Sequence, residues 1–122
     1  MGVDMSGVNK VIIVGNIGNK EVKEAGSSQV ANLSVATSES WKDKETGERK
    51  EVTEWHNIVL WGQPAKFVEQ YLDKGDKVYI EGKLKTRNWE DDGVKKYRTE
   101  IIGNQIQNLG KKDSGNQEDI PF

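Results

Sequence analysis

The chain has 122 residues, which is enough for one compact domain and too few for two of ordinary size. It contains no Cys, which excludes disulfides and thiolate metal sites, and its single His leaves little scope for His-based catalysis. The net charge is −2, yet residues 1–112 hold 18 basic and 17 acidic side chains, so overall charge does not exclude a nucleic-acid partner.

No apolar run approaches the roughly 20 residues that a membrane span requires, and the first residues lack the basic region and apolar stretch of a secretory signal. The chain also lacks a phosphate-binding loop, a metal-spaced acidic cluster and a nucleophile elbow. We therefore expect a cytoplasmic protein that is not an enzyme and requires no metal or other cofactor. His56 has no companion at ligand spacing, and we expect it to form a hydrogen bond in the core or between subunits.

The first part of the chain predicts two strands and a long hairpin. β-Branched residues indicate a first strand over Val8–Gly15, and alternating apolar side chains indicate a second over Val30–Glu39. The segment between Trp41 and Trp55 is too highly charged to be core, and its Thr46-Gly47 pair suits a hairpin tip. This segment is either a solvated loop or an arm that contacts nucleic acid.

A third strand is predicted over Val52–Trp61, because its side chains alternate with a period of two. One face carries Trp55 and Trp61, and the other carries His56, Ile58 and Leu60. A short helix should follow, with Pro64 in its first turn and Gly75 at its end, and with apolar residues at helical spacing: Phe67, Val68, Tyr71 and Leu72.

A fourth strand is predicted over Val78–Trp89, where one face is apolar and the other is basic and aromatic. Asp91-Asp92-Gly93 indicates a hairpin turn, and Tyr97–Leu109 a fifth strand. Five strands with a helix between the third and fourth predict an all-β chain with one short helix, the OB-fold. This is a five-stranded, partly open Greek-key barrel that binds oligonucleotides and oligosaccharides.

We expect the OB domain to comprise residues 1–110. Residues 111–122 have too few apolar groups to offset the entropy of ordering, and we expect a short, flexible and disordered tail. Its last five residues differ in composition, because apolar Ile120 and Phe122 stand beside the acidic Glu118 and Asp119. They are either a frayed terminus or a binding peptide.

The four Trp residues and the basic face of the fourth strand are the candidate binding site. Trp89 shares strand parity with Lys83, Lys85 and Arg87, and Trp55 shares it with Trp61. Indole rings stack on bases of any identity, and cations neutralise phosphates, so the combination is typical of single-strand binding. The alternative is that each Trp lies in the core or a subunit interface and that the basic side chains are only solvated.

Five segments in order resemble the bacterial single-stranded DNA-binding proteins. They are Val8–Asn16 (VNKVIIVGN), Ala36–Trp41 (ATSESW), Thr53–His56 (TEWH), Lys77–Gly82 (KVYIEG) and Asp119–Phe122 (DIPF). The resemblance covers nearly the whole chain. It implies a homotetramer of OB domains around which single-stranded DNA wraps. The protein would thereby coat and protect the DNA during replication, recombination and repair.

The resemblance also assigns residues. It implies stacking by Trp41, Trp55 and Trp89, with Trp61 as a further aromatic platform, and it places His56 near the subunit interface. Together with the strand parities it gives a basic set of candidate DNA contacts: Lys10, Lys42, Lys44, Arg49, Lys50, Lys83, Lys85 and Arg87. The tip, Glu118, Asp119, Ile120, Pro121 and Phe122, would dock on replication, recombination and repair enzymes, with Phe122 in an apolar pocket and its carboxylate on a basic site.

Three departures from the family pattern stand out. Asn57 and Asn88 replace residues that are often basic or otherwise polar in relatives, which puts those individual phosphate contacts in doubt. The acidic run of the tip is short, and residues 110–117 replace a long linker, as would suit a phage- or plasmid-borne member. An RNA-binding OB protein, a carbohydrate-binding OB module and an adaptor that acts through its tail are the alternatives left open by the residues themselves.

Overall fold

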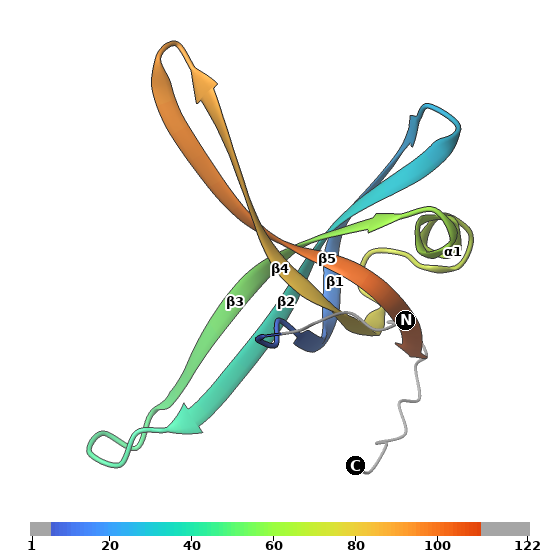
Figure 1. Cartoon of the computed structure of the whole chain (residues 1–122). Helices are drawn as coiled ribbons and strands as arrows, with labels where there is room; N and C mark the ends of the chain where they lie inside the picture. Colours follow the sequence, from blue (N-terminus) through green and yellow to red (C-terminus); the bar gives the residue numbers. More distant parts are fainter. Residues whose placement is uncertain (1–5, 111–122) are drawn as a thin grey trace.

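Five strands and one helix make up the computed structural model, in which residues 6–110 are described (Figure 1). The elements in chain order are β1 (Val11–Ala25), β2 (Ser28–Lys42), β3 (Arg49–Trp61), α1 (Gln63–Tyr71), β4 (Lys77–Asp91) and β5 (Val94–Gly110). The strands form a closed barrel in the order β1-β2-β3-β5-β4, in which the short β3–β5 pairing is parallel and the others are antiparallel. The predicted OB-fold, with its helix between the third and fourth strands, is confirmed.

Inward-facing residues of the strands and one side of α1 fill the barrel. Completely or almost completely buried members include Ile17, Leu33, Val35, Ile58, Leu60, Val68, Leu72, Val78 and Ile80. Ile58 and Leu60 face the core, as the period of two predicts, and their neighbours Asn57 and Trp61 are exposed, whereas Val59 between them is also buried. The barrel therefore offers its outer face, rather than an internal cavity, for binding.

The strands are longer than the sequence predicted, because three hairpins continue beyond the barrel (Figure 1). β1 does not end at Gly15 but runs to Ala25, which pairs with Ser28 across a two-residue turn where Gly26 has a φ of 68°. The β4–β5 turn at Asp92-Gly93 has positive φ at both residues, as predicted for an acidic-Gly hairpin. Each arm is a two-stranded ribbon. Side chains of the β2–β3 and β4–β5 arms are largely exposed, whereas most of those in the β1–β2 arm are half-buried.

The third arm, the β2–β3 hairpin, contains the segment that the sequence left open as a loop. Regular cross-strand pairing continues to Lys42 and Arg49. At the tip, the Asp43 carboxylate accepts hydrogen bonds from the Glu45 and Thr46 amides at 2.8 and 3.4 Å. The Glu45 amide is the main reason, ahead of the Lys50 ammonium, why the pKa of Asp43 is below its ordinary value.

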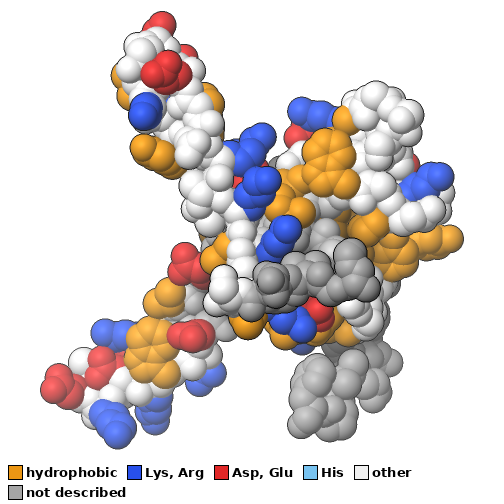
Figure 2. Space-filling model, in the orientation of Figure 1, with side chains coloured by type: hydrophobic (Ala, Val, Ile, Leu, Met, Phe, Trp, Pro, Cys, Tyr) orange, Lys and Arg blue, Asp and Glu red, His pale blue; other side chains and the backbone are white. Residues whose placement is uncertain are grey.

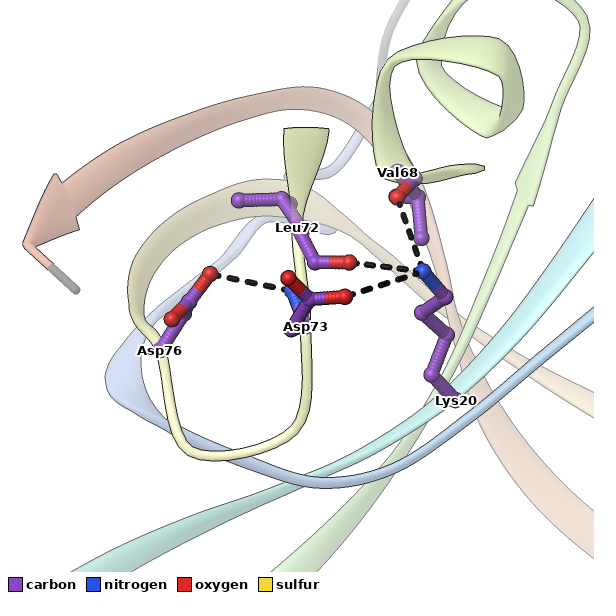
Figure 3. A network of polar contacts seen from close by, with 5 residues as sticks. All are labelled: Lys20, Val68, Leu72, Asp73 and Asp76. Carbon is purple, nitrogen blue, oxygen red and sulfur yellow. Dashed lines mark hydrogen bonds and ion pairs between the residues drawn. The ribbon is translucent and has the colours of Figure 1, made fainter. Parts of the chain in front are cut away.

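Helix α1 closes one end of the barrel, and the C-terminal end of the helix is hydrogen-bonded to Lys20 of β1. The helix ends at Tyr71, followed by Leu72, and not at Gly75 as predicted from the glycine. The Lys20 ammonium of β1 donates to the Leu72 and Val68 carbonyls at 2.7 and 3.4 Å (Figure 3). A cation at this place satisfies terminal carbonyl groups and complements the helix dipole.

The remaining expectations concern the tail, membrane-spanning helices and metal sites. The predicted tail, residues 111–122, lies outside the described residues, and so does its acidic tip. No helix within residues 6–110 has the length and apolar character needed to cross a membrane. The same residues contain no group of three His, Cys, Asp or Glu side chains placed to hold a metal ion.

Candidate nucleic-acid interface

An open groove runs over the outer face of the β1–β2–β3 sheet, at the base of the β4–β5 hairpin. It consists of two adjoining hollows of about 380 and 400 Å³. The two hollows share one lining residue from each of the five strands: Lys23, Asn32, Val59, Arg87 and Glu100. Cross-strand pairing builds its floor, because Lys23 pairs with Val30 and Val30 pairs with Trp61. In Figure 2, Lys and Arg side chains gather where the β4–β5 hairpin leaves the barrel, beside hydrophobic side chains.

Two indole rings belong to this outer face. Trp55 and Trp61 are 56% and 52% exposed, and they share the parity of Asn57 and Val59 on β3. Trp61 lines the groove directly, and Trp55 lies against Gly18 of β1, next to the groove residues Asn19 and Asn57. The large apolar surface that these rings leave in water is available to a planar ligand.

The basic wall of the groove comes from β4 and β5. Lys85 and Arg87 of β4 line it, as the fourth-strand parity predicted. Arg98 of β5 lies directly opposite Arg87 and lines the same groove. Glu100 forms ion pairs with both arginines, at 3.2 Å to Arg87 Nε and 3.7 Å to Arg98 Nε.

Trp89 lies farther out on the same hairpin and is 45% exposed. Lys96 is directly opposite it, and Lys96 also forms an ion pair with Asp91 at 3.4 Å. A third hollow, of about 370 Å³, lies between Trp89 and Tyr97 near the tip of the arm. Trp89 thus extends the series of exposed aromatic rings along the hairpin with Lys96 beside it, whereas Tyr97 pairs with Asn88 and belongs to the opposite face of the ribbon.

The structure does not bring Trp41 to the groove. Trp41 pairs with Lys50, whereas Trp55 pairs with Ala36, and this odd spacing puts the two indoles on opposite faces of the β2–β3 hairpin. Lys50 also forms an ion pair with Asp43 at 3.2 Å.

The other predicted basic residues are divided among several surfaces. Arg49 donates to the Ser40 hydroxyl at 3.1 Å, while Lys42 and Lys44 are exposed on the same arm without an ion pair among the described residues. Lys83 is exposed on β4 beyond the groove lining. Lys10 forms an ion pair with Glu81 at 3.4 Å on the side of β1 and β4.

Two hydrogen-bonded side chains lie outside the groove. His56 Nε2 and Thr37 Oγ1 are 2.9 Å apart, so the half-buried imidazole has a partner within its own chain. The Tyr79 hydroxyl donates to the Glu81 carboxylate at 2.9 Å, and this bond is the main reason that the pKa of Tyr79 is above its ordinary value. The predicted role of His56 at a subunit interface stays a prediction.

The sequence analysis missed the basic and acidic residues of β5. The signal was present, because the two-residue turn at Asp92-Gly93 makes Asp91 pair with Val94 and thereby fixes the pairs from there to Gly82 and Gly103. Counting back from this turn places Lys96 opposite Trp89 and Arg98 opposite Arg87. Lys23 of β1 had no comparable signal, since its place in the groove depends on the closure of the barrel.

Comparisons with known proteins assign the chain to a family with this fold. The model of the single-strand binding protein family matches residues 8–109. The structure of a Plasmodium falciparum single-stranded DNA-binding protein in complex with single-stranded DNA is 35% identical, with a TM-score of 0.74, over 88% of this chain and 99% of that one. A deletion mutant of the single-stranded DNA-binding protein from Thermus aquaticus is 29% identical, with a TM-score of 0.70, over 84% of this chain and 50% of that one. This chain therefore matches about half the length of the Thermus protein.

Proposed function

Because the chain belongs to the single-strand binding protein family, a family of non-enzymatic DNA-binding proteins, we propose that it binds single-stranded DNA in the groove at the base of the β4–β5 hairpin. Bases stack on Trp55 and Trp61, and Lys85, Arg87 and Arg98 contact phosphates. The structure of the Plasmodium relative with single-stranded DNA supports single-stranded DNA as the ligand.

The observation that carries the proposal is the combination of half-exposed indoles with cations around one open groove. Stacking of a base on an aromatic side chain contributes about 1–3 kcal/mol, and it depends little on which base is stacked. Each phosphate contact releases condensed counterions, which makes binding favourable at low salt. Both terms are independent of sequence, so the proposed function is general coating and protection of unpaired DNA.

The remaining predicted contacts extend the path of the DNA beyond the groove. Trp89 and Lys83 belong to β4, and the β2–β3 arm contributes an aromatic ring and several cations. We propose that the strand continues along these arms, which requires DNA to pass from one face of the molecule to another. The β2–β3 arm contributes Trp41, Lys42, Lys44, Arg49 and Lys50, and Lys10 would extend the path beside β1 and β4.

Assembly and partner recruitment are further parts of the proposal. A homotetramer would let one strand wrap around several grooves, with His56 near the interface between subunits. The tip from Glu118 to Phe122 would recruit replication, recombination and repair enzymes through one apolar anchor and a few charges. Such short peptides bind weakly and exchange readily.

The test is a titration of fluorescently labelled oligo-dT with the protein, followed by anisotropy at several salt concentrations. Trp55→Ala is expected to weaken binding by about 1–3 kcal/mol, and affinity should fall steeply as salt increases. Tyr71→Ala is the matched control, because Tyr71 is a similarly exposed aromatic residue of α1, away from the groove. Equal affinities of the parent and Trp55→Ala would contradict the proposed site.

The same assay separates the alternatives. Preference for oligo-U over oligo-dT of the same length would indicate an RNA-binding protein that uses the 2′-hydroxyl. Binding of a neutral oligosaccharide with little dependence on salt would indicate a carbohydrate-binding module.

A further inference from the structure

A buried carboxylate lies in the groove, where negative charge opposes DNA. Glu100 is 5% exposed, and its Oε1 and Oε2 atoms lie 3.2 and 3.7 Å from the Nε atoms of Arg87 and Arg98. We infer that Glu100 is a positioning residue that holds the two guanidinium groups as one phosphate-binding pair. This inference rests on the proposed function and assigns a role to a residue that touches no DNA itself.

The ion pairs hold each guanidinium from one side. The Glu100 carboxylate lies closest to the two Nε atoms, in ion pairs without a hydrogen bond, and within residues 6–110 the Nη donors of Arg87 and Arg98 donate to no acceptor. Both arginine side chains are about half exposed. Because the five donors of a guanidinium lie in one rigid plane, a buried negative charge beside Nε also orients the Nη donors.

Without the carboxylate, the two arginines would separate. They are direct cross-strand partners on β4 and β5, and like charges in that relation repel. An arginine that is free to change rotamer also loses that freedom when it binds a phosphate, which reduces affinity. Glu100 reduces both the repulsion between the arginines and the rotamer freedom that they lose on binding. Arg87, Arg98 and Glu100 together keep a net charge of +1.

The sign of one substitution distinguishes positioning from simple charge. Glu100→Gln keeps the shape and removes the negative charge, so Coulomb attraction alone would tighten DNA binding. Positioning predicts the opposite, a weakening of about threefold to tenfold in oligo-dT anisotropy at fixed salt. The matched control is Glu69→Gln, because Glu69 is an exposed carboxylate of α1 that lies outside the groove lining and accepts a hydrogen bond from Gln29. It should leave affinity unchanged.

A double-mutant cycle shows whether the effect passes through the arginines. In a protein that carries both Arg87→Gln and Arg98→Gln, Glu100→Gln has no guanidinium to position and should weaken binding no further. General damage to the barrel would still weaken binding in this background. Melting temperatures of all variants identify the folded ones.

A second pair of variants keeps the inference testable if Glu100→Gln does not fold. Arg87→Lys and Arg98→Lys together retain both charges but lack the planar Nε edge, and they should also weaken binding by about threefold to tenfold. Unchanged or tighter binding by Glu100→Gln, or by the lysine pair if that variant is needed, overturns the inference. If the parent protein fails to bind oligo-dT, the proposed function is wrong. If the parent binds and Trp55→Ala weakens binding, but Glu100→Gln does not, only the inference about Glu100 is wrong.

Discussion

The indole ring of Trp55 lies against the backbone of Gly18, with ring carbon Cη2 2.7 Å from the place that a Cβ on Gly18 would occupy. Gly18 stands at a shift of register between β1 and β2, where Ile17 pairs with Val35 but Asn19 pairs with Ser34. A bulge of this kind redirects the neighbouring chain. The absent side chain gives the indole a flat support on one side while about half of the ring stays exposed.

Gly18→Ala is therefore expected to weaken DNA binding without touching DNA. The added methyl group must displace the Trp55 ring, and holding a side chain about 30° off its rotamer costs about 0.5–1.5 kcal/mol. The measurement is the affinity for labelled oligo-dT, with circular dichroism to verify the fold. In a Trp55→Ala background the same glycine substitution should have no further effect, and an equal loss in both backgrounds would show that the contact is irrelevant to binding.

Local strand chemistry was enough to predict much of the fold and part of the groove. The alternation over Val52–Trp61 separated Ile58 and Leu60, which are buried, from Trp55 and Trp61, which are exposed. The same rule put Lys85 and Arg87 on the outer face of β4. These assignments succeeded because a strand that closes a barrel has only two faces, and one must be apolar.

The arms were harder to predict, because their pairing does not depend on burial. Residues 42–51 are highly charged, and the sequence predicts a hairpin tip there without deciding between a solvated loop and an arm that contacts nucleic acid. In the structure Lys42 and Arg49 are cross-strand partners. Backbone hydrogen bonds and the Asp43 turn hold this ribbon in solvent, where hydrophobic alternation gives no signal. The position of Trp41 opposite Lys50 follows from the register of that ribbon.

The groove itself depends on contacts between distant parts of the chain. Lys23, Asn32, Arg87 and Glu100 come together only when the barrel closes. In the sequence, Glu100 is one acidic residue among many, and its burial between two arginines has no local signature.

Deleting Ile120–Phe122 tests the predicted division of labour between domain and tail. The deletion removes the apolar anchor of the tip, and we expect it to abolish capture of replication, recombination and repair enzymes from a cell extract. Affinity for oligo-dT should stay within about twofold of the parent, because the groove residues are unchanged. Loss of both activities would show that the tail also contributes to DNA binding.

Lowering the pH should loosen the tip of the β2–β3 arm. The amides of Glu45 and Thr46 stabilise the ionised Asp43 carboxylate and lower its pKa. The stabilisation that the ionised carboxylate gives the turn is thus complete above the ordinary Asp pKa of about 3.9 and is lost as the pH falls through the lowered value. Carboxyl chemical shifts measured by NMR should report a midpoint below 3.9, with the Glu45 amide moving in parallel. In Asp43→Asn the Glu45 amide should show no such transition, and a midpoint at or above 3.9 would contradict the Asp43 contacts.

Lys20 and Lys23 are two residues of β1 that should affect different properties. Lys20 donates to the Leu72 and Val68 carbonyls and has a weak ion pair with the exposed Asp73, so Lys20→Met should lower the free energy of unfolding by about 1–2 kcal/mol. Lys23 lines the groove, and Lys23→Met should leave stability within about 0.5 kcal/mol but weaken oligo-dT binding. Urea denaturation measures the stability of both variants, and anisotropy measures their affinity for oligo-dT. The assignment is wrong if the two substitutions change stability and affinity in the same proportion.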